Sequence, residues 1–295
     1  MNIETLSWFP QLVGGDEARF FREHWRKRTL FTPGAVPELR GWYDVARFIE
    51  DYGRVGYHDA TLLIGLDEQH RRVMLRPNQN VVGEALGQGM SVVLQALQLP
   101  EQAIDATPQW RFFLNLYDAL CAYLLPGFPS RAPTGGPVAA LDIFCTTAET
   151  SIGGHYDTGD VFYFVLDGEK EWTVELVPDP AEGHRLTATG TNYTLDRSAL
   201  KEHINITVTP GDCLYVPPYT YHRVQSHGRS LAVSCGLPTY TEVTLLRTAL
   251  SRIQQERMIF EPLPSYPRTE GDLFERAERE VKQRAGAVLD LLATR

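Results

Sequence analysis

Long apolar runs are missing from this chain of 295 residues. Its apolar runs, such as residues 62–66, have the length of a strand, whereas a membrane-spanning helix needs about 20 consecutive apolar residues. The first fifteen residues contain no Lys or Arg and no apolar segment typical of a secretory or transit signal. We therefore expect no membrane span and a cytoplasmic location.

Cysteine and basic residues are also scarce. The four cysteines, Cys121, Cys145, Cys213 and Cys235, lie far apart and form no C-x-x-C pair, which indicates reduced, buried thiols and argues against a disulfide framework or a Cys-ligated zinc. The chain has 28 Lys and Arg against 37 Asp and Glu, a net charge of -9. This balance produces no field that attracts phosphates, so we expect no nucleic-acid partner.

The chain is nevertheless rich enough in apolar residues, at 43%, to bury a sizeable core. Its pattern predicts three regions: a mainly helical region over 1–137 that packs on the core, short strands over 138–237, and helices again over 238–295. The middle block is typical of a β-sandwich or small barrel. The expected fold class is mainly β with flanking helices.

Local signals refine the first region. Asp16 can cap a helix, residues 61–76 have the pattern of two strands joined by a polar turn, and Thr107 with Pro108 opens a helix that ends before Pro126.

Two apolar stripes mark the last region, Val243, Leu246, Leu250 and Ile253 in one predicted helix and Val281, Val288 and Leu292 in another. Such stripes must be buried against something. They either cover the flank of the barrel or form a homodimer contact.

The first chemical signal is His155-Tyr156-Asp157 in the β block. Residues i and i+2 of a strand point to the same face, so an imidazole and a carboxylate would project side by side as two metal ligands. Alone this match is weak, because a histidine on a strand is more often a hydrogen-bonded core residue.

The second signal is a lysine on an apolar face. Residues 161–166 and 169–176 are predicted to form a hairpin about Asp167-Gly168, and Lys170 shares its face with apolar residues while the opposite, acidic face meets solvent. A buried ammonium needs an anion. That anion is either a structural salt-bridge partner or a carboxylate-bearing ligand inside the barrel.

The third signal is His222, which begins a strand after a Pro-bounded bend. A barrel can bring it beside His155 and Asp157. Two imidazoles and one carboxylate on one face of a metal leave three adjacent positions open, as in non-haem Fe(II) oxygenases.

The strings HYDTGDVFYFVLDGEKEW and PGDCLYVPPYTYH resemble those of the JmjC and cupin-like 2-oxoglutarate oxygenases, especially the branch of ribosomal oxygenases and asparaginyl hydroxylases. The resemblance covers residues 138–237 well and 17–36 loosely. It implies a double-stranded β-helix, Fe(II) held by His155, Asp157 and His222, and 2-oxoglutarate and O2 as cosubstrates. It also implies that Lys170, fifteen residues after the first His, binds the far carboxylate of 2-oxoglutarate.

The chain departs from that family at several positions. Ile152 stands where relatives often carry a hydroxyl residue, so a second hydrogen bond to 2-oxoglutarate must come from elsewhere. Val165 stands where ribosomal oxygenases commonly place Gln, and the segment after Pro238 is too short for their winged-helix region. Ser234 occupies a position where relatives place a polar residue near the cosubstrate, and the alternative for it is a core or solvent-facing serine.

Other candidates have weaker support. We expect Asp160, His203 and His227 to be solvated surface residues. Four aromatic residues are either core or pocket lining: Tyr163, Trp172, Tyr215 and Tyr221.

Together these features predict an Fe(II)- and 2-oxoglutarate-dependent oxygenase that hydroxylates an amino-acid side chain in a protein, a peptide or a related small molecule. The alternatives are an N-methyl demethylase of the same mechanism, another cupin metalloenzyme, and a catalytically silent cupin that serves as an interaction module.

Overall fold

The computed structural model describes residues 9–55, 59–66, 72–77, 82–126, 130, 139–189, 200–239 and 279. The chain divides into two compact units, residues 1–131 with 138–239, and residues 132–137 with 240–295. Apart from Arg279, the described residues all belong to the first unit. The apolar stripes of the C-terminal region lie outside the described residues, and the division at residues 137 and 237 stays a prediction.

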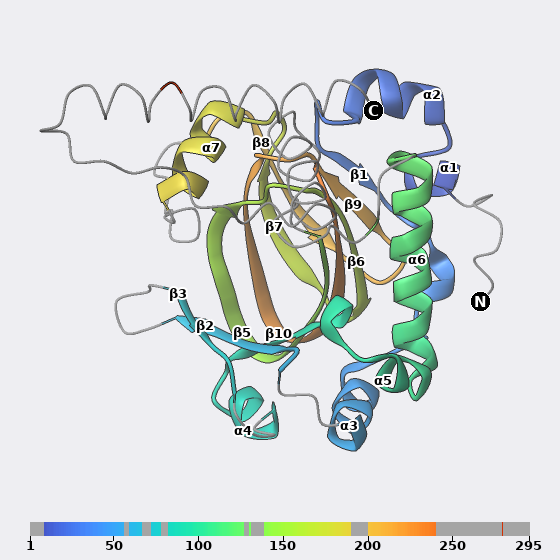
Figure 1. Ribbon diagram of the computed structural model, residues 1–295, viewed down its shortest axis with the longest axis vertical. Coiled ribbons are helices and arrows are strands. Elements are labelled where there is room, and N and C mark those ends of the chain that lie inside the picture. The colour runs from blue at the N-terminus through green and yellow to red at the C-terminus, as the bar shows by residue number, and fades with distance from the viewer. Residues whose placement is uncertain are drawn as a thin grey trace, which may run out of the picture. The chain divides into compact units, whose positions relative to one another are not determined.

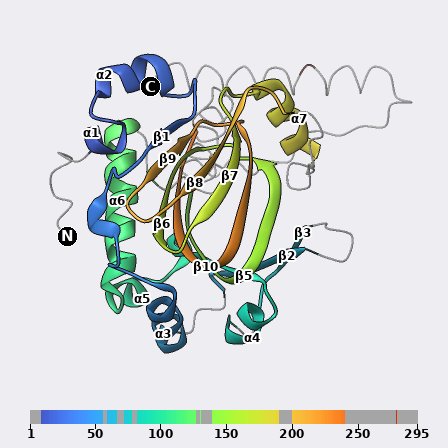
Figure 2. The same cartoon turned by 180° about the vertical axis from the view of Figure 1, so that it is seen from behind.

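Within the first unit a β-barrel is flanked by helices, as Figures 1 and 2 show. The strands are β1 (Leu30–Thr32), β2 (Thr61–Leu66), β3 (Arg72–Leu75), β4 (Ser91–Gln95), β5 (Ala140–Tyr156), β6 (Asp160–Asp167), β7 (Lys170–Glu175), β8 (His203–Val208), β9 (Cys213–Val216) and β10 (Tyr221–Leu237). The α-helices are α1 (Phe9–Leu12), α2 (Glu17–Arg19), α3 (Val45–Val55), α4 (Val82–Gly87), α5 (Glu101–Asp105), α6 (Pro108–Leu124) and α7 (Pro180–Thr189). A π-helix (Phe20–His24) and two short 3-10 helices (Pro37–Leu39 and Ala96–Gln98) complete the set.

The two longest strands, β5 and β10, organise the barrel. They pair antiparallel along almost their whole length, and both bend from one sheet into the other. One sheet runs in the order β1-β9-β6-β10-β5-β4-β2-β3. The strand β7 pairs on one side with residues 222–225 of β10 and on the other side with β8. This arrangement is the double-stranded β-helix, and it confirms the predicted fold class, mainly β with flanking helices.

The sequence predicted that β6 and β7 pair with each other as a hairpin, and this prediction is wrong. Both strands form, but β6 pairs with residues 231–237 of β10, whereas β7 pairs with residues 222–225 of the same strand. The turn at Gly168 therefore carries the chain from one sheet to the other. Gly168 has a φ of +68°, and a Cβ there would lie 2.1 Å from the carbonyl oxygen of Arg229, so no other residue fits.

Two cores lie on opposite faces of the first sheet. Alternate residues of β5, β6 and β10 pack outward against α6 and other N-terminal elements, and these include Ile143, Phe162, Val233 and the helix residue Tyr117. The residues between them point into the barrel, where a smaller apolar core forms around Trp172. Period-two alternation thus assigns one face of each strand to the helices and the other to the interior.

The N-terminal region is less helical than the sequence predicts, because it supplies strands to the sheet. β2 and β3 were expected, whereas β4 was not assigned from the sequence. The side chain of Asp16 caps α2 as predicted, by accepting from the backbone N–H of Arg19 at 2.8 Å, and Thr107 precedes α6. Among the described residues, no helix is both long and apolar enough to cross a membrane.

Candidate metal centre and cosubstrate cavity

Strand pairing brings the two predicted imidazoles together. His155, near the end of β5, is the direct antiparallel partner of His222, at the start of β10. Their ring centroids lie 4.2 Å apart, and both side chains are buried. Sixty-seven residues of chain separate the two positions, so only the β5–β10 register makes them neighbours.

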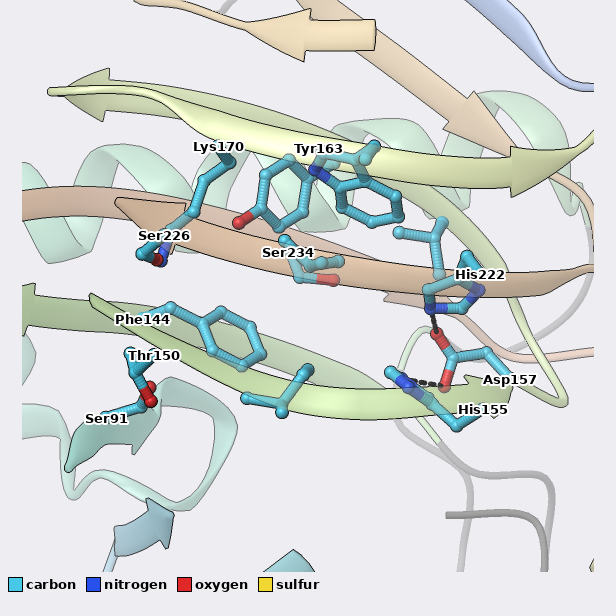
Figure 3. Close-up of a pocket in the computed structure, with 14 residues that line it drawn as sticks. Ser91, Phe144, Thr150, His155, Asp157, Tyr163, Lys170, His222, Ser226 and Ser234 are labelled. Carbon is cyan, nitrogen blue, oxygen red and sulfur yellow. Dashed lines mark hydrogen bonds and ion pairs between the residues drawn. The ribbon is translucent and has the colours of Figure 1, made fainter. Parts of the chain in front are cut away.

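Asp157 completes the group from the turn after β5. Its two carboxylate oxygens lie 3.8 Å from Nε2 of His155 and 3.5 Å from Nε2 of His222 (Figure 3). One ligand atom from each of the three residues falls within a mutual distance of 4.8 Å. The backbone N–H of Tyr219 donates to the Asp157 carbonyl at 2.8 Å and so ties this turn to the bend before β10.

Backbone carbonyls set the tautomer of both imidazoles. Nδ1 of His155 lies 3.2 Å from the carbonyl of Gly153, and Nδ1 of His222 lies 3.0 Å from that of Thr220. A carbonyl only accepts, so each Nδ1 donates to that carbonyl, and Nε2 is the ring atom that faces Asp157 and can ligate a metal. Metal-binding histidines are oriented in the same way, so this donor set fits a divalent cation such as Fe(II).

A cavity extends from these three residues into the barrel. It ends at Lys170, and its walls include Phe144, Tyr163, Trp172 and Ser234. The indole of Trp172 stacks on the His222 ring at 5.2 Å and so limits its movement. The lining is apolar near its middle and polar at both ends, which suits a short ligand with two charged ends.

Lys170 lies on the inward face of β7, as the sequence predicts, and is only 4% exposed. Its Nζ donates to the hydroxyl of Ser226, and among the described residues no carboxylate pairs with it. Burial lowers the pKa of Lys170 to about 8. Of the two anions that the sequence left open, a structural carboxylate is therefore absent from the described part of the chain.

Ser234 also lines this cavity, and its contact with the cosubstrate stays a prediction. It lies in a row across the sheet, with Tyr163 on one side and Asp142 on the other. Ile152 lines the cavity without offering a hydroxyl, as expected. Asp142 was not singled out from the sequence, since an isolated carboxylate in a strand carries no motif.

A second, wider groove adjoins the inner cavity. It shares His155, Asp157 and Ser234 with the inner cavity and is bounded by β2, β3 and β4. Apolar side chains dominate its walls, and Asp142 supplies a carboxylate. Two of the three predicted ligands, His155 and Asp157, thus line both the inner cavity and the outer groove, whereas His222 lines the inner cavity.

Asp160 is a correction to the sequence analysis, which expected it on the surface. Its side chain is fully buried, 3.0 Å from Nε of Arg26, and accepts from the Tyr215 hydroxyl at 2.7 Å. The N-terminal segment covers it, which no local pattern indicates. Tyr215 is accordingly core, whereas Tyr163 and Trp172 line the cavity.

The remaining candidates do not line the inner cavity. Tyr221 packs on Tyr156 in a small separate cluster. His203 and His227 are exposed as predicted, and His227 pairs with Glu171 at 2.6 Å. The acidic face of β7 is only partly solvated, because Glu175 is buried and accepts from the backbone N–H of Lys201 at 3.0 Å.

Comparison with known proteins supports this picture. Residues 137–245 match the JmjC domain family. A probable ribosomal oxygenase of Haemophilus influenzae is 25% identical over 225 residues, which are 74% of this chain and 48% of that protein. The chain therefore spans about half the length of this curated relative.

Solved structures of similar fold include the Escherichia coli ribosomal oxygenase YcfD, with a TM-score of 0.55 and 17% identity over 90% of this chain and 66% of that one. A second YcfD structure, in complex with cobalt and 2-oxoglutarate, has the same TM-score, identity and coverage. The family resemblance predicted from the sequence is confirmed.

Proposed function

We propose, from the premise that residues 137–245 of this chain form a JmjC domain, that the protein is an Fe(II)- and 2-oxoglutarate-dependent oxygenase. One observation carries the proposal: the inner cavity holds a His-Asp-His group at one end and a buried lysine with no carboxylate partner, among the described residues, at the other. A 2-oxo dicarboxylate has a metal-chelating end and a second carboxylate, which match these two ends.

The residues that line the inner cavity would have distinct roles. His155, Asp157 and His222 hold Fe(II), and Lys170 pairs with the distal carboxylate of 2-oxoglutarate. Bound iron, with 2-oxoglutarate and O2, supplies the oxidising power that inserts oxygen into a C–H bond while 2-oxoglutarate becomes succinate and carbon dioxide. The surrounding apolar walls position the cosubstrate and exclude water.

The outer groove suggests a polypeptide substrate. It opens beside the metal ligands and is bounded by β2, β3, β4 and β5, so an extended segment that lies along these strands would bring one side chain to the metal. The curated relative is named a probable ribosomal oxygenase, so we propose a side chain of a ribosomal or other protein as the site of hydroxylation. The carboxylate of Asp142 in the groove favours a cationic side chain.

Three further expectations belong to the proposal. The protein acts in the cytoplasm, where its four free, buried thiols stay reduced. It acts without nucleic acid as a direct ligand. Residues 243–292 either form a homodimer contact or cover the barrel, and a light-scattering mass of two chains would support the homodimer.

The test of the function uses the purified chain with Fe(II), ascorbate, 2-oxoglutarate and ribosomal protein or peptide mixtures. We expect succinate to form and a substrate to gain the mass of one oxygen. The double variant His155→Ala/Asp157→Ala should bind no metal and form no succinate.

His227→Ala is the matched control, because His227 is an exposed imidazole that does not line either cavity and pairs only with Glu171 among the described residues. It should match the parent. Equal metal content in the double variant and the parent would show that the metal is bound elsewhere and would reject the proposal. A mass loss of one methylene group, accompanied by formaldehyde, would identify the demethylase instead.

A further inference from the structure

One residue beside the metal ligands has a backbone conformation that its side chain disfavours. Tyr219, in the bend before β10, has a φ of +58°. A Cβ makes this left-handed region unfavourable for a bulky residue, whereas glycine adopts it freely. Among the described residues, Arg26 is the other non-glycine residue with a positive φ. Backbone strain of this kind persists only where the surroundings hold it in place, and it is concentrated at functional sites.

The strained bend holds two of the three predicted metal ligands. The backbone N–H of Tyr219 donates to the carbonyl of Asp157 at 2.8 Å. The carbonyl of the next residue, Thr220, accepts from Nδ1 of His222 at 3.0 Å. A carboxylate oxygen of Asp157 faces Nε2 of His222 at 3.5 Å (Figure 3). Rotation about the N–Cα bond of Tyr219 would therefore move the N–H that holds Asp157 relative to the carbonyl that holds His222.

Helix α7 contacts Tyr219 through both its backbone and its side chain. The carbonyl of Tyr219 accepts from the backbone N–H of Asp179 at 2.7 Å, just before α7 begins. The carboxylate of Asp179 in turn accepts from the backbone N–H of Glu182 at 3.2 Å, in the first turn of the helix. A Cβ added at Gly183 would lie 2.6 Å from Cδ1 and 2.8 Å from Cβ of Tyr219. A larger residue therefore fits at position 183 only if the Tyr219 side chain moves.

We propose that Tyr219 is a positioning residue of the metal centre and that the first turn of α7 keeps it in its strained conformation. The inference rests on the proposed function, because it concerns the same metal ligands. Tyr219 lines neither the inner cavity nor the outer groove, so it acts through Asp157 and His222. A glycine at position 219 would avoid the strain, but it would lack the side chain that packs on Gly183. The Tyr219 side chain thus couples α7 to the geometry of the metal centre.

The test measures how the full chain binds Co(II), a spectroscopic substitute for Fe(II), by competition with a chelator. Gly183→Ala places a methyl group against the Tyr219 side chain, far from any metal ligand in the sequence. We expect its Co(II) affinity to fall about 10- to 100-fold, the usual effect of changing a residue that orients metal ligands. The visible absorption bands of bound Co(II), which depend on its coordination geometry, should also shift.

Gly53→Ala is the matched control. Gly53 is also a helical glycine, in α3, and a Cβ added there meets nothing within 4 Å. This variant should have the Co(II) affinity and the absorption bands of the parent.

A double-mutant cycle tests whether α7 acts through the Tyr219 side chain. Tyr219→Gly removes that side chain together with the backbone strain, and it should also lower Co(II) affinity about 10- to 100-fold. In the Tyr219→Gly background, Gly183→Ala should have no further effect, because the three atoms nearest to the new methyl group all belong to the Tyr219 side chain. Tyr219→Phe, which keeps the ring, should bind Co(II) about tenfold more tightly than Tyr219→Gly.

Several results would overturn the inference. One is an unchanged Co(II) affinity and spectrum in Tyr219→Gly, which also decides the question if Gly183→Ala does not fold. Another is a pair of losses that add in the double variant, which would mean that α7 affects the metal by a route other than Tyr219. An equal loss in Tyr219→Phe and Tyr219→Gly would assign the effect to the hydroxyl. A parent that binds neither Co(II) nor Fe(II) would reject the proposed function itself, and with it this inference.

Discussion

Two buried charges in the same barrel have opposite surroundings. Asp160 is completely buried, yet it contacts the guanidinium of Arg26 and accepts a hydrogen bond from Tyr215. Lys170 is nearly as buried, and among the described residues it has a single hydroxyl partner. Burial raises the pKa of Asp160, and Arg26 and Tyr215 act in the opposite direction, whereas no carboxylate among the described residues offsets the burial of Lys170.

The difference separates a structural charge from a binding charge. Asp160 joins the start of β6 to the N-terminal segment that carries Arg26, so its partners stabilise the fold. Burial of the Lys170 ammonium destabilises the ligand-free protein, and an anion that enters the cavity offsets this cost. Removing the partners of the first charge should therefore unfold the protein, whereas removing the second should affect ligand binding.

The largest effect is expected from Arg26→Met, which leaves the Asp160 carboxylate buried without a cation. The free energy of unfolding should fall by about 3–5 kcal/mol, measured by urea denaturation. The 2-oxoglutarate affinity of the folded fraction should not change, since Arg26 does not line the cavity. If stability stays within about 0.5 kcal/mol of the parent, as for an ordinary surface substitution, Asp160 is not a structural charge.

Lys170→Met should have the opposite effects: unchanged or higher stability and weaker binding of 2-oxoglutarate. The variant keeps an apolar stem and loses a desolvated charge, so its unfolding free energy should match or exceed that of the parent. Binding of 2-oxoglutarate to the Fe(II) protein without oxygen should weaken by roughly 2 to 5 kcal/mol, or about 30-fold to several thousand-fold.

Metal content is the control for this variant, since His155, Asp157 and His222 are unchanged. Tight 2-oxoglutarate binding by Lys170→Met would mean that Lys170 does not contact the cosubstrate. An unfolded variant would mean that Lys170, like Asp160, is a structural charge.

The pH dependence of stability gives a test of the Lys170 charge that needs no ligand. The pKa of Lys170 is about 8 in the folded protein and about 10.4 in an unfolded chain. Between these values the unfolded chain binds more protons at this side chain, so Lys170 contributes a rise in stability with pH of at most roughly 3 kcal/mol. Burial raises the pKa of the four cysteines, and these thiols contribute a fall over the same range. Chemical denaturation of the parent and of Lys170→Met at pH 8 and pH 10, without ligand, isolates the Lys170 contribution as the difference between the two proteins. The same stability change in parent and variant would refute the assignment to Lys170.

The smallest effect is expected from Tyr215→Phe. This change removes the hydrogen bond that the hydroxyl donates to Asp160 and the one that it accepts from the backbone N–H of Arg26, while the Arg26 guanidinium still pairs with Asp160. The loss should be about 1.5–3 kcal/mol of unfolding free energy, with unchanged 2-oxoglutarate affinity. Double-mutant analysis with Arg26→Met should reveal coupling, because both residues bind the same carboxylate. Strict additivity would show that the two partners act independently.

The sequence alone determined the local features of this protein. Period-two alternation placed Lys170 on the inward face of β7, because this depends only on backbone geometry within one strand. The i, i+2 spacing predicted that His155 and Asp157 lie close together, and they do, although β5 ends at Tyr156 and Asp157 lies in the turn after it. The family resemblance added the role expected for His222. Each of these statements concerns residues that are near in sequence or a motif with fixed spacing.

Tertiary structure decided everything that depends on which strand lies beside which. The β5–β10 register sets His155 opposite His222, and β10 separates β6 from β7, although the sequence between those strands is typical of a hairpin. The environment of Asp160 follows from Arg26, 134 residues earlier in the chain. Strand order and side-chain burial result from packing over the whole barrel, so a local pattern specifies which face a residue occupies but not the partner it meets there.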